Sequence, residues 1–500
     1  MAGRQLKRFG LTRRGALGGL ISALASGALA EAPRRSLRPV ARAGGVPPEA
    51  AGTDYLAAIT DARVTGDVGV AVADLADPLA VTEGFGGARL LPPASVTKTF
   101  TAVYALGTLG PDHRFTTRLL ADGEVVDGVL SGDLILAGGG DPHLVTDDLA
   151  EMAQRMRDAG LREVRGRFLI WEGALPTVRH IDPEQLDHLG YSPAVSGLNL
   201  NFNRVHFEWR TASTGYTVTM DARSDTRRPD VSMARMRIED RDLPVYTYSD
   251  SGGVDNWTVA QSALGQGGAR WLPVRFPGLY AGDVFRSLAA GVGVRLPAAE
   301  VMDRPPMGAP LVVYPSAPLS DIVTDMLFHS TNLTAEVIGM AATAVNQGVV
   351  KDLRFSSAAM ARWLVGRYGV AARLVDHSGL SDQSRVTANG MVRFLSRPEV
   401  VEILRARLKA VPILDGEGRP IPNHAVSVAA KTGTLNFVAA LAGYVGTARG
   451  GTKAFAIFAA DSDRREEAKG SQDEVPRGAR SWNARARALQ QKFLVQWGQS

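Results

Sequence analysis

The sequence predicts an α/β (α+β) fold in which an antiparallel sheet flanked by helices is interrupted by inserted α/β and β-rich domains. Short apolar strand patterns occur near both ends of the chain, and helical patterns accompany them. The middle, from about residue 118 to 297, is instead rich in Gly, Asp and Arg. We therefore assign residues 31–115 and 301–500 to one domain and residues 116–300 to inserted accessory domains.

The first domain is predicted to begin with two strands and a helix. The stretches "DVGVAVADL" and "LAVTEGF" alternate in polarity and are joined by a turn. Pro92 and Pro93 interrupt this pattern, and a helix-compatible run starts at Ser95. Taken alone, a small hydroxyl residue after two prolines is an ordinary helix start.

The inserted region mixes both kinds of element. The run "SGDLILAGGGDP" and polar runs such as "YTVTMDA" indicate strands, and residues 147–159 indicate a helix. Gly138 to Gly140 could suggest a phosphate loop, but no Gly-Lys-Ser/Thr follows, which favours a turn. A helical pattern resumes at residues 319–344.

The C-terminal part predicts three consecutive antiparallel strands and a closing helix. The strands are "AVSVAAKTGTLN", "AALAGYVGT" and "KAFAIFAADS", separated by Gly-rich turns. The closing helix places Leu489, Phe493, Leu494 and Trp497 on one face. This face could anchor the chain to a membrane, but packing against a sheet is the favoured interpretation.

Residues 1–30 combine a basic start, a Gly/Ala/Leu run and a closing "ALA", which is typical of a secretory signal. Adjacent Arg13 and Arg14 fit twin-arginine export, with the general secretory route as the alternative. The run from Gly15 to Leu29 is shorter than the roughly 20 apolar residues that a membrane span requires. We therefore predict an exported, periplasmic protein without a stable membrane span.

Composition excludes several classes of partner and site. The chain has 56 basic and 51 acidic residues, and the first 30 residues hold five bases and no acid, so 56 − 5 = 51 bases would face 51 acids after cleavage. A formally neutral mature chain argues against nucleic acid as a partner. Cysteine is absent, and the eight histidines show no His-Glu-x-x-His spacing. We predict neither a metal nor an organic cofactor.

Lysine is rare, with eight residues against 48 arginines, so a lysine can mark a position that needs an amine of tunable pKa. Ser95 and Lys98 form a Ser-x-x-Lys motif. Residues i and i+3 share one face of a helix, so the Lys98 amine can reach the Ser95 hydroxyl and, when neutral, take its proton.

Two further motifs carry weaker signals. "KTGTLN" places Lys431 and Thr432 on an apolar strand, where an amine and a hydroxyl could hold a substrate carboxylate, and Gly433 would allow close approach of another backbone. A substrate peptide could add to that strand's edge. Ser330 and Asn332, in "FHSTNLTAE", could shuttle a proton and hold a substrate amide.

Together the motifs occur in the order Ser-x-x-Lys, Ser-x-Asn and Lys-Thr-Gly, the signature of penicillin-binding proteins and serine β-lactamases. The chain resembles the D-alanyl-D-alanine carboxypeptidase/endopeptidase family of low-molecular-mass penicillin-binding proteins. The stretches that carry the resemblance are "LILAGGGDPHL", "SGLNLNFNRV", "STNLTAEVIG", "DHSGLSDQSRVTA" and "KTGTLNFVAALAGYV". Members carry domains inserted between the first two motifs, and here Lys98 and Ser330 are 330 − 98 = 232 residues apart.

The resemblance implies a penicillin-binding-protein/β-lactamase-like transpeptidase fold and a role for each motif residue. Ser95 would be the acylated nucleophile, Lys98 its general base and Ser330 the proton relay. Asn332 would bind the substrate amide. Lys431, Thr432, Gly433 and Thr434 would form the substrate-binding strand. Lys431 and Thr432 would engage the substrate carboxylate, and the backbone N–H groups of Ser95 and Thr434 would stabilise the oxyanion.

The implied function is a serine D-Ala-D-Ala carboxypeptidase or DD-endopeptidase that acts on peptidoglycan stem peptides and is inhibited by β-lactams. A serine β-lactamase is one alternative, although no Glu-x-x-x-Asn follows Asn332. A non-catalytic peptidoglycan-binding protein is the other. Two departures from the family pattern, Thr331 and His377, remove no catalytic side chain.

Overall fold

The computed structural model describes residues 54–77, 81, 83–471 and 473–499, all within one compact unit, Pro47–Ser500. The secretory signal predicted for residues 1–30 lies outside the described residues. Among those described, no helix combines the length and apolar character that crossing a membrane requires.

Strands from both ends of the chain form one antiparallel sheet of six strands, in the order β17-β18-β19-β20-β1-β2. The three consecutive C-terminal strands and the two N-terminal ones are as predicted. The strands are β1 (Asp67–Asp74), β2 (Glu83–Phe85), β17 (Lys409–Ala410), β18 (Ser427–Leu435), β19 (Val438–Gly446) and β20 (Thr452–Ala460). The first and last of the long strands lie side by side, because β1 pairs with β20 along its whole length.

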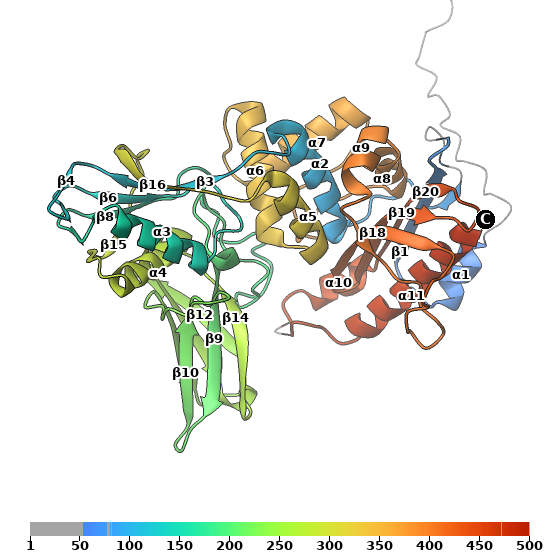
Figure 1. Ribbon diagram of the computed structural model, residues 1–500. Helices are drawn as coiled ribbons and strands as arrows, with labels where there is room; N and C mark the ends of the chain where they lie inside the picture. The colour runs from blue at the N-terminus through green and yellow to red at the C-terminus, as the bar shows by residue number, and fades with distance from the viewer. Residues whose placement is uncertain (1–53, 78–80, 82, 472, 500) are drawn as a thin grey trace, which may run out of the picture. The chain divides into compact units, whose positions relative to one another are not determined.

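Each face of this sheet packs against helices, since successive side chains of a strand point to opposite faces. In β20, Phe458 belongs to the apolar cluster on one face and Ile457 to the cluster on the other. The first face packs against α2 (Thr97–Leu109), α5 (Leu319–His329), α6 (Asn332–Gln347), α7 (Leu353–Tyr368), α8 (Ala388–Leu395) and α9 (Pro398–Leu404) (Figure 1). The second packs against α1 (Tyr55–Asp61) and α11 (Ala479–Gln499).

The closing helix packs against the sheet, as predicted. In α11, Leu489, Phe493, Leu494 and Trp497 are all buried in the cluster on the second face. The helical pattern predicted at residues 319–344 is two helices, α5 and α6, because Ser330 adopts a left-handed conformation with φ 61° between them.

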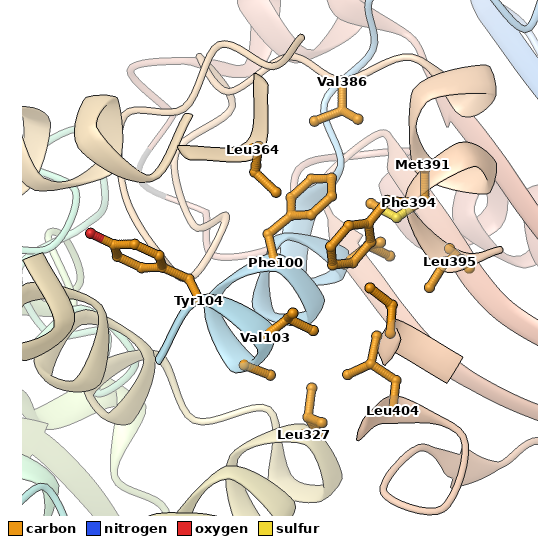
Figure 2. Packing of buried hydrophobic residues seen from close by; sticks show 14 of the residues in the cluster. Phe100, Val103, Tyr104, Leu327, Leu364, Val386, Met391, Phe394, Leu395 and Leu404 are labelled. Atoms are coloured by element: carbon orange, nitrogen blue, oxygen red, sulfur yellow. The ribbon is translucent and has the colours of Figure 1, made fainter. Parts of the chain in front are cut away.

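The helix α2 runs through the larger apolar cluster (Figure 2). Phe100 is fully buried, and its ring centroid lies 4.7 Å from that of Phe394 in an edge contact. Val103, on the same helix, and Leu327, from α5, belong to the same cluster. Truncating such a residue costs about 3–5 kcal/mol, so the dry packing around Phe100 fixes the position of the whole helix.

The inserted region has its own sheets and its own apolar core. Its five-stranded sheet has the order β15-β8-β6-β3-β16, with strands β3 (Thr116–Ala121), β6 (Leu134–Ala137), β8 (Phe168–Trp171), β15 (Ala299–Val301) and β16 (Ala309–Pro315). The last two strands carry this sheet beyond residue 300. Two helices belong to the same core, α3 (Thr146–Asp158), predicted at 147–159, and α4 (Pro277–Gly291).

The remaining strands of the insertion form three small sheets, ordered β10-β9-β14, β11-β13-β12 and β4-β5-β7. They are β4 (Val125–Val126), β5 (Val129–Leu130), β7 (Glu163–Val164), β9 (Arg204–Thr211), β10 (Tyr216–Asp221), β11 (Ala234–Glu239), β12 (Tyr246–Ser251), β13 (Val254–Ala260) and β14 (Gly267–Pro273). Short 3-10 turns are η1 (Ala94–Val96), η2 (Asn201–Asn203) and η3 (Gln261–Ala263), and α10 (Ser462–Ala468) follows β20.

Candidate active site

Ser95 lies in the 3-10 turn η1, immediately before α2, and Lys98 lies in the first turn of that helix. The Lys98 Nζ is 3.0 Å from the Ser95 Oγ, the contact that the i, i+3 spacing predicts. Ala94 has φ 46°, so the chain enters η1 through a left-handed residue. The turn therefore presents Ser95 at the end of a helix whose apolar face is anchored in the core.

Lys98 is completely buried and has two further hydrogen-bond partners. Its Nζ donates to the Oδ1 of Asn332 at 2.7 Å and to the carbonyl oxygen of Ser378 at 2.8 Å. Burial lowers the pKa of Lys98 well below its usual value, and the charge of Lys431 lowers it further. A neutral amine has two N–H groups and one lone pair, so donation to these two oxygens leaves the lone pair for the Ser95 hydroxyl.

Two buried carboxyl groups, which the sequence analysis did not identify, lie near this lysine. Glu336 accepts hydrogen bonds from the backbone N–H groups of His377 and Ser378, each at 2.9 Å. Asp376 accepts from two further backbone N–H groups of the same loop. Burial raises the pKa of both carboxyls, while their charge raises that of Lys98. The one available signal was an acid within the apolar run "NLTAEVIGMAA".

Lys431 is held on β18 with 3% of its surface exposed. Its Nζ donates to the Ser330 Oγ and to its neighbour's carbonyl oxygen, that of Thr432, each at 2.9 Å. Burial lowers the pKa of Lys431 to about 8. The second and third motifs are therefore joined directly, by an amine that is cationic at neutral pH.

Two glycines allow the backbone to pack tightly against the turn that carries Ser95. A Cβ at Gly433 would lie 2.8 Å from the carbonyl oxygen of Pro93 and 2.9 Å from the backbone nitrogen of Ser95. A Cβ at Gly379, which has φ 75°, would lie 1.8 Å from the carbonyl oxygen of Ala94. The close approach predicted for Gly433 is thus to this chain's own nucleophile turn.

A cleft of about 690 Å³ opens beside these groups. Four of the predicted site residues line it, namely Ser95, Ser330, Asn332 and Thr434. Lys98, Lys431 and Gly433 are buried behind this lining. Thr432 does not line the cleft and is exposed on β18. The three motifs, separated in the sequence, therefore meet at one cavity.

The departure at His377 does not enter the cleft. The side chain is fully buried, and its ring occupies the space where a Cβ on Gly339 would lie, 2.3 Å from the ring. The His377 Nε2 forms a 2.7 Å hydrogen bond with the Ser356 Oγ. Burial lowers the pKa of His377 to about 3, so the ring is neutral.

Comparison with known proteins supports the family that the three motifs indicate. The family model of the D-Ala-D-Ala carboxypeptidase 3 (S13) family matches residues 54–478. A D-alanyl-D-alanine carboxypeptidase from Actinomadura sp. (strain R39) is 29% identical over 448 residues, covering 78% of each chain.

Solved structures agree on the fold. Penicillin binding protein 4 (dacB) from Haemophilus influenzae matches with a TM-score of 0.69 at 18% identity, covering 88% of this chain and 99% of that chain. The same protein complexed with a β-lactam matches with a TM-score of 0.67 at 19% identity, again covering 88% and 99%. The predicted penicillin-binding-protein fold is confirmed, and the family match does not favour a β-lactamase or a non-catalytic binding protein. The chain belongs to the D-Ala-D-Ala carboxypeptidase 3 (S13) family, and it is a serine-type carboxypeptidase.

Proposed function

We propose that the protein hydrolyses the D-Ala-D-Ala ends or cross-links of peptidoglycan stem peptides through an acyl-enzyme on Ser95. One observation carries this proposal: the Lys98 amine, fully buried and with a strongly lowered pKa, is 3.0 Å from the Ser95 Oγ. An amine whose pKa is lowered by burial and which contacts a hydroxyl is the arrangement that general-base activation of a serine requires.

In the first step, Ser95 attacks the carbonyl carbon of the scissile peptide bond as its proton passes to Lys98. A bond forms between the serine oxygen and that carbon, and the backbone N–H groups of Ser95 and Thr434 stabilise the resulting oxyanion. The bond to the leaving nitrogen then breaks. Ser330, which accepts a hydrogen bond from the cationic Lys431, relays to the leaving amine the proton that Lys98 took, and Lys98 is neutral again.

The substrate is held along the edge of β18. The neighbouring strand β17 covers that edge only at Ala429 and Ala430, and from Lys431 to Leu435 no described residue pairs with it as a strand. An extended peptide can add there by main-chain hydrogen bonds. The Lys431 cation and the Thr434 hydroxyl, which lines the cleft, then engage the terminal carboxylate. Gly433 admits the nucleophile turn beside them, and Asn332 binds the substrate amide.

In the second step, water attacks the acyl carbon while Lys98 takes its proton. The bond to the serine oxygen breaks, Lys98 returns the proton to that oxygen, and the shortened peptide leaves. β-Lactams would acylate the same serine. The β-lactam complex of the Haemophilus influenzae protein supports this part of the proposal.

The proposal extends to organisation and location. Residues 31–115 and 301–500 would form the peptidase domain, and residues 116–300 the accessory domains, whose five-stranded sheet runs on to Pro315. Residues 1–30 would direct export to the periplasm, where the peptidoglycan substrate lies.

Mass spectrometry of the purified protein after brief exposure to benzylpenicillin tests this function. We expect an adduct on the peptide containing Ser95, and no adduct on Ser95→Ala. Absence of an adduct with rapid penicillin turnover would indicate a β-lactamase. Absence of both adduct and turnover would indicate a binding protein.

A further inference from the structure

One long segment of the inserted region reaches the active site. Residues 172–200 connect β8 to η2 without a helix or strand, and they contribute Glu184, Leu189 and Tyr191 to the lining of the cleft. A long irregular segment pays a large conformational entropy to adopt one structure, so specific contacts must hold it.

Arg275 provides such contacts. It lies between β14 and α4, with 1% of its surface exposed. Its guanidinium donates to three backbone carbonyl oxygens of the segment, those of Arg179 at 2.9 Å, Asp187 at 2.8 Å and Ser192 at 2.6 Å. A single planar group thus ties together three points of the segment that are far apart along it.

Arg275 is itself fixed to the inserted region's core. Its backbone N–H donates to the Asp255 Oδ2 at 3.0 Å, and the Tyr248 hydroxyl donates to the Asp255 Oδ1 at 2.8 Å. Asp255 is completely buried. Gly190 also fits closely against β14, because a Cβ there would lie 2.8 Å from the Trp271 carbonyl oxygen.

The residue before Ser192 touches the catalytic groups. The carbonyl oxygen of Tyr191 accepts a 2.8 Å hydrogen bond from the Asn332 Nδ2. A carbonyl oxygen can only accept, so this contact determines which end of the Asn332 amide faces which partner. The Asn332 Oδ1 is thereby directed at Lys98, which donates to it at 2.7 Å.

This orientation matters for the base. With Asn332 reversed, its N–H groups would face Lys98 and compete with Ser95 for the lone pair of the neutral amine. We propose that Arg275 is a positioning residue for acylation: by holding residues 179–192, it places the Tyr191 carbonyl that orients Asn332 toward Lys98. This inference rests on the proposed function, and it assigns the inserted region a part in the chemistry.

The test measures the second-order rate constant of acylation by a fluorescent penicillin for Arg275→Met, Asn332→Ala and the double variant. We expect Arg275→Met to slow acylation roughly tenfold or more, because small displacements of catalytic groups cost that much. In the Asn332→Ala background the same change should alter the rate by less than about twofold, since coupled residues are non-additive.

A structural role alone would not produce this pattern. Arg223→Met is the matched control, since Arg223 is an arginine of the same inserted region that pairs with Asp221 and Glu208 and makes no hydrogen bond to residues 172–200 in the described chain. It should acylate at the wild-type rate. Arg275→Lys, which can reach only some of the three carbonyls, provides a second variant if Arg275→Met does not fold, with faster hydrogen exchange expected in residues 179–192 and unchanged exchange in α2.

The outcomes separate the two proposals. If Asn332→Ala acylates at the wild-type rate, the role of Asn332 and this inference both fail. If Asn332→Ala is slow while Arg275→Met and Arg275→Lys are not, only the inference fails. If Arg275→Met slows acylation by the same factor in the wild-type and Asn332→Ala proteins, the inference also fails, because Arg275 would then act independently of Asn332.

Discussion

The two sides of the cleft are held together by different forces. The catalytic wall, formed by η1, α2, Ser330 to Asn332 and β18, rests on the helix α2, whose apolar side chains are buried in the main apolar cluster. The outer wall, formed by residues 172–200, 461–471 and 473–478, is held instead by pairs of polar side chains. Lys469 and Glu184 are 3.2 Å apart, and Glu474 pairs with both Arg270 at 2.6 Å and His188 at 3.0 Å.

The burial of each wall determines how strongly its charged groups interact. Glu474 and Glu184 each expose 42% of their side chains, so water and salt screen these pairs, and each contributes at most about 1 kcal/mol. On the catalytic wall, Lys98 and Lys431 are buried, and burial lowers the pKa of both amines. The charge of Lys431 lowers the pKa of Lys98 further. Chemistry therefore depends on the catalytic wall and on the Tyr191 carbonyl that orients Asn332, and we expect the polar pairs of the outer wall to tune access to the cleft.

The largest effect should follow from removing the base on the catalytic wall. Lys98→Met replaces the amine by a side chain of similar length, and we expect acylation by penicillin to slow roughly 10³-fold, because general-base catalysis contributes about 10²–10⁴-fold. Stopped-flow fluorescence measures the rate. Circular dichroism checks that the fold is retained, and acylation within tenfold of wild type would remove Lys98 from the base role.

The next effect concerns the close approach at Gly433. In Gly433→Ala the new Cβ would meet the backbone of Pro93 and Ser95 and displace the nucleophile, which we expect to slow acylation by about 10²-fold. Gly366→Ala is the control, since Gly366 is exposed within α7 with nothing within 4 Å of its Cβ position. That variant should keep full activity and gain about 0.5–1 kcal/mol of stability in thermal unfolding. Similar activity losses in both variants would contradict the packing argument.

The charge of Lys431 should appear in the pH dependence. Its pKa of about 8 means that the amine is cationic below that pH and neutral above it, so the hold on the substrate carboxylate is lost as pH rises through about 8. We expect kcat/KM for a D-Ala-D-Ala peptide to fall about tenfold per pH unit above that point. In Lys431→Arg, which stays charged, this fall should move to higher pH, whatever the maximal rate. The test is to measure kcat/KM for both proteins from about pH 6 to about pH 10. If the fall at alkaline pH is the same in Lys431→Arg, it is due to a group other than Lys431.

The smallest effect belongs to the polar pairs of the outer wall. Glu474→Gln removes its pairs with Arg270 and His188, and we expect KM for the peptide to change about threefold or less, with kcat unchanged. Raising salt from about 0.05 M to about 0.5 M should change wild-type KM in the same direction and leave the variant less affected. A large loss of kcat in Glu474→Gln would show that these polar pairs take part in the chemistry.

Local patterns in the sequence predicted much of the fold and part of the site. The apolar runs of residues 425–462, separated by Gly-rich turns, predicted β18, β19 and β20, since short apolar runs bounded by turn residues are a local signal of strands. The spacing of Ser95 and Lys98 predicted their 3.0 Å contact, because one helical turn fixes it. The order of the three motifs predicted the family.

Other parts of the site could not be predicted. Glu336 and Asp376 come from different segments and act near Lys98 only after folding. Tyr191 contributes a backbone carbonyl oxygen, which no side-chain pattern reveals. Arg275 binds three carbonyls of another segment, and among 48 arginines nothing in the sequence distinguishes it.

By itself, the sequence determined which groups are available for catalysis and, through local periodicity, the elements that carry them. Only the tertiary structure decided their state. The pKa of Lys98 depends first on burial beneath the cleft and then on the charge of Lys431, which folding brings close from a distant strand. Burial depends on which atoms surround a group in space, and a Coulombic interaction depends on the distance between two charges. Separation along the chain determines neither of them.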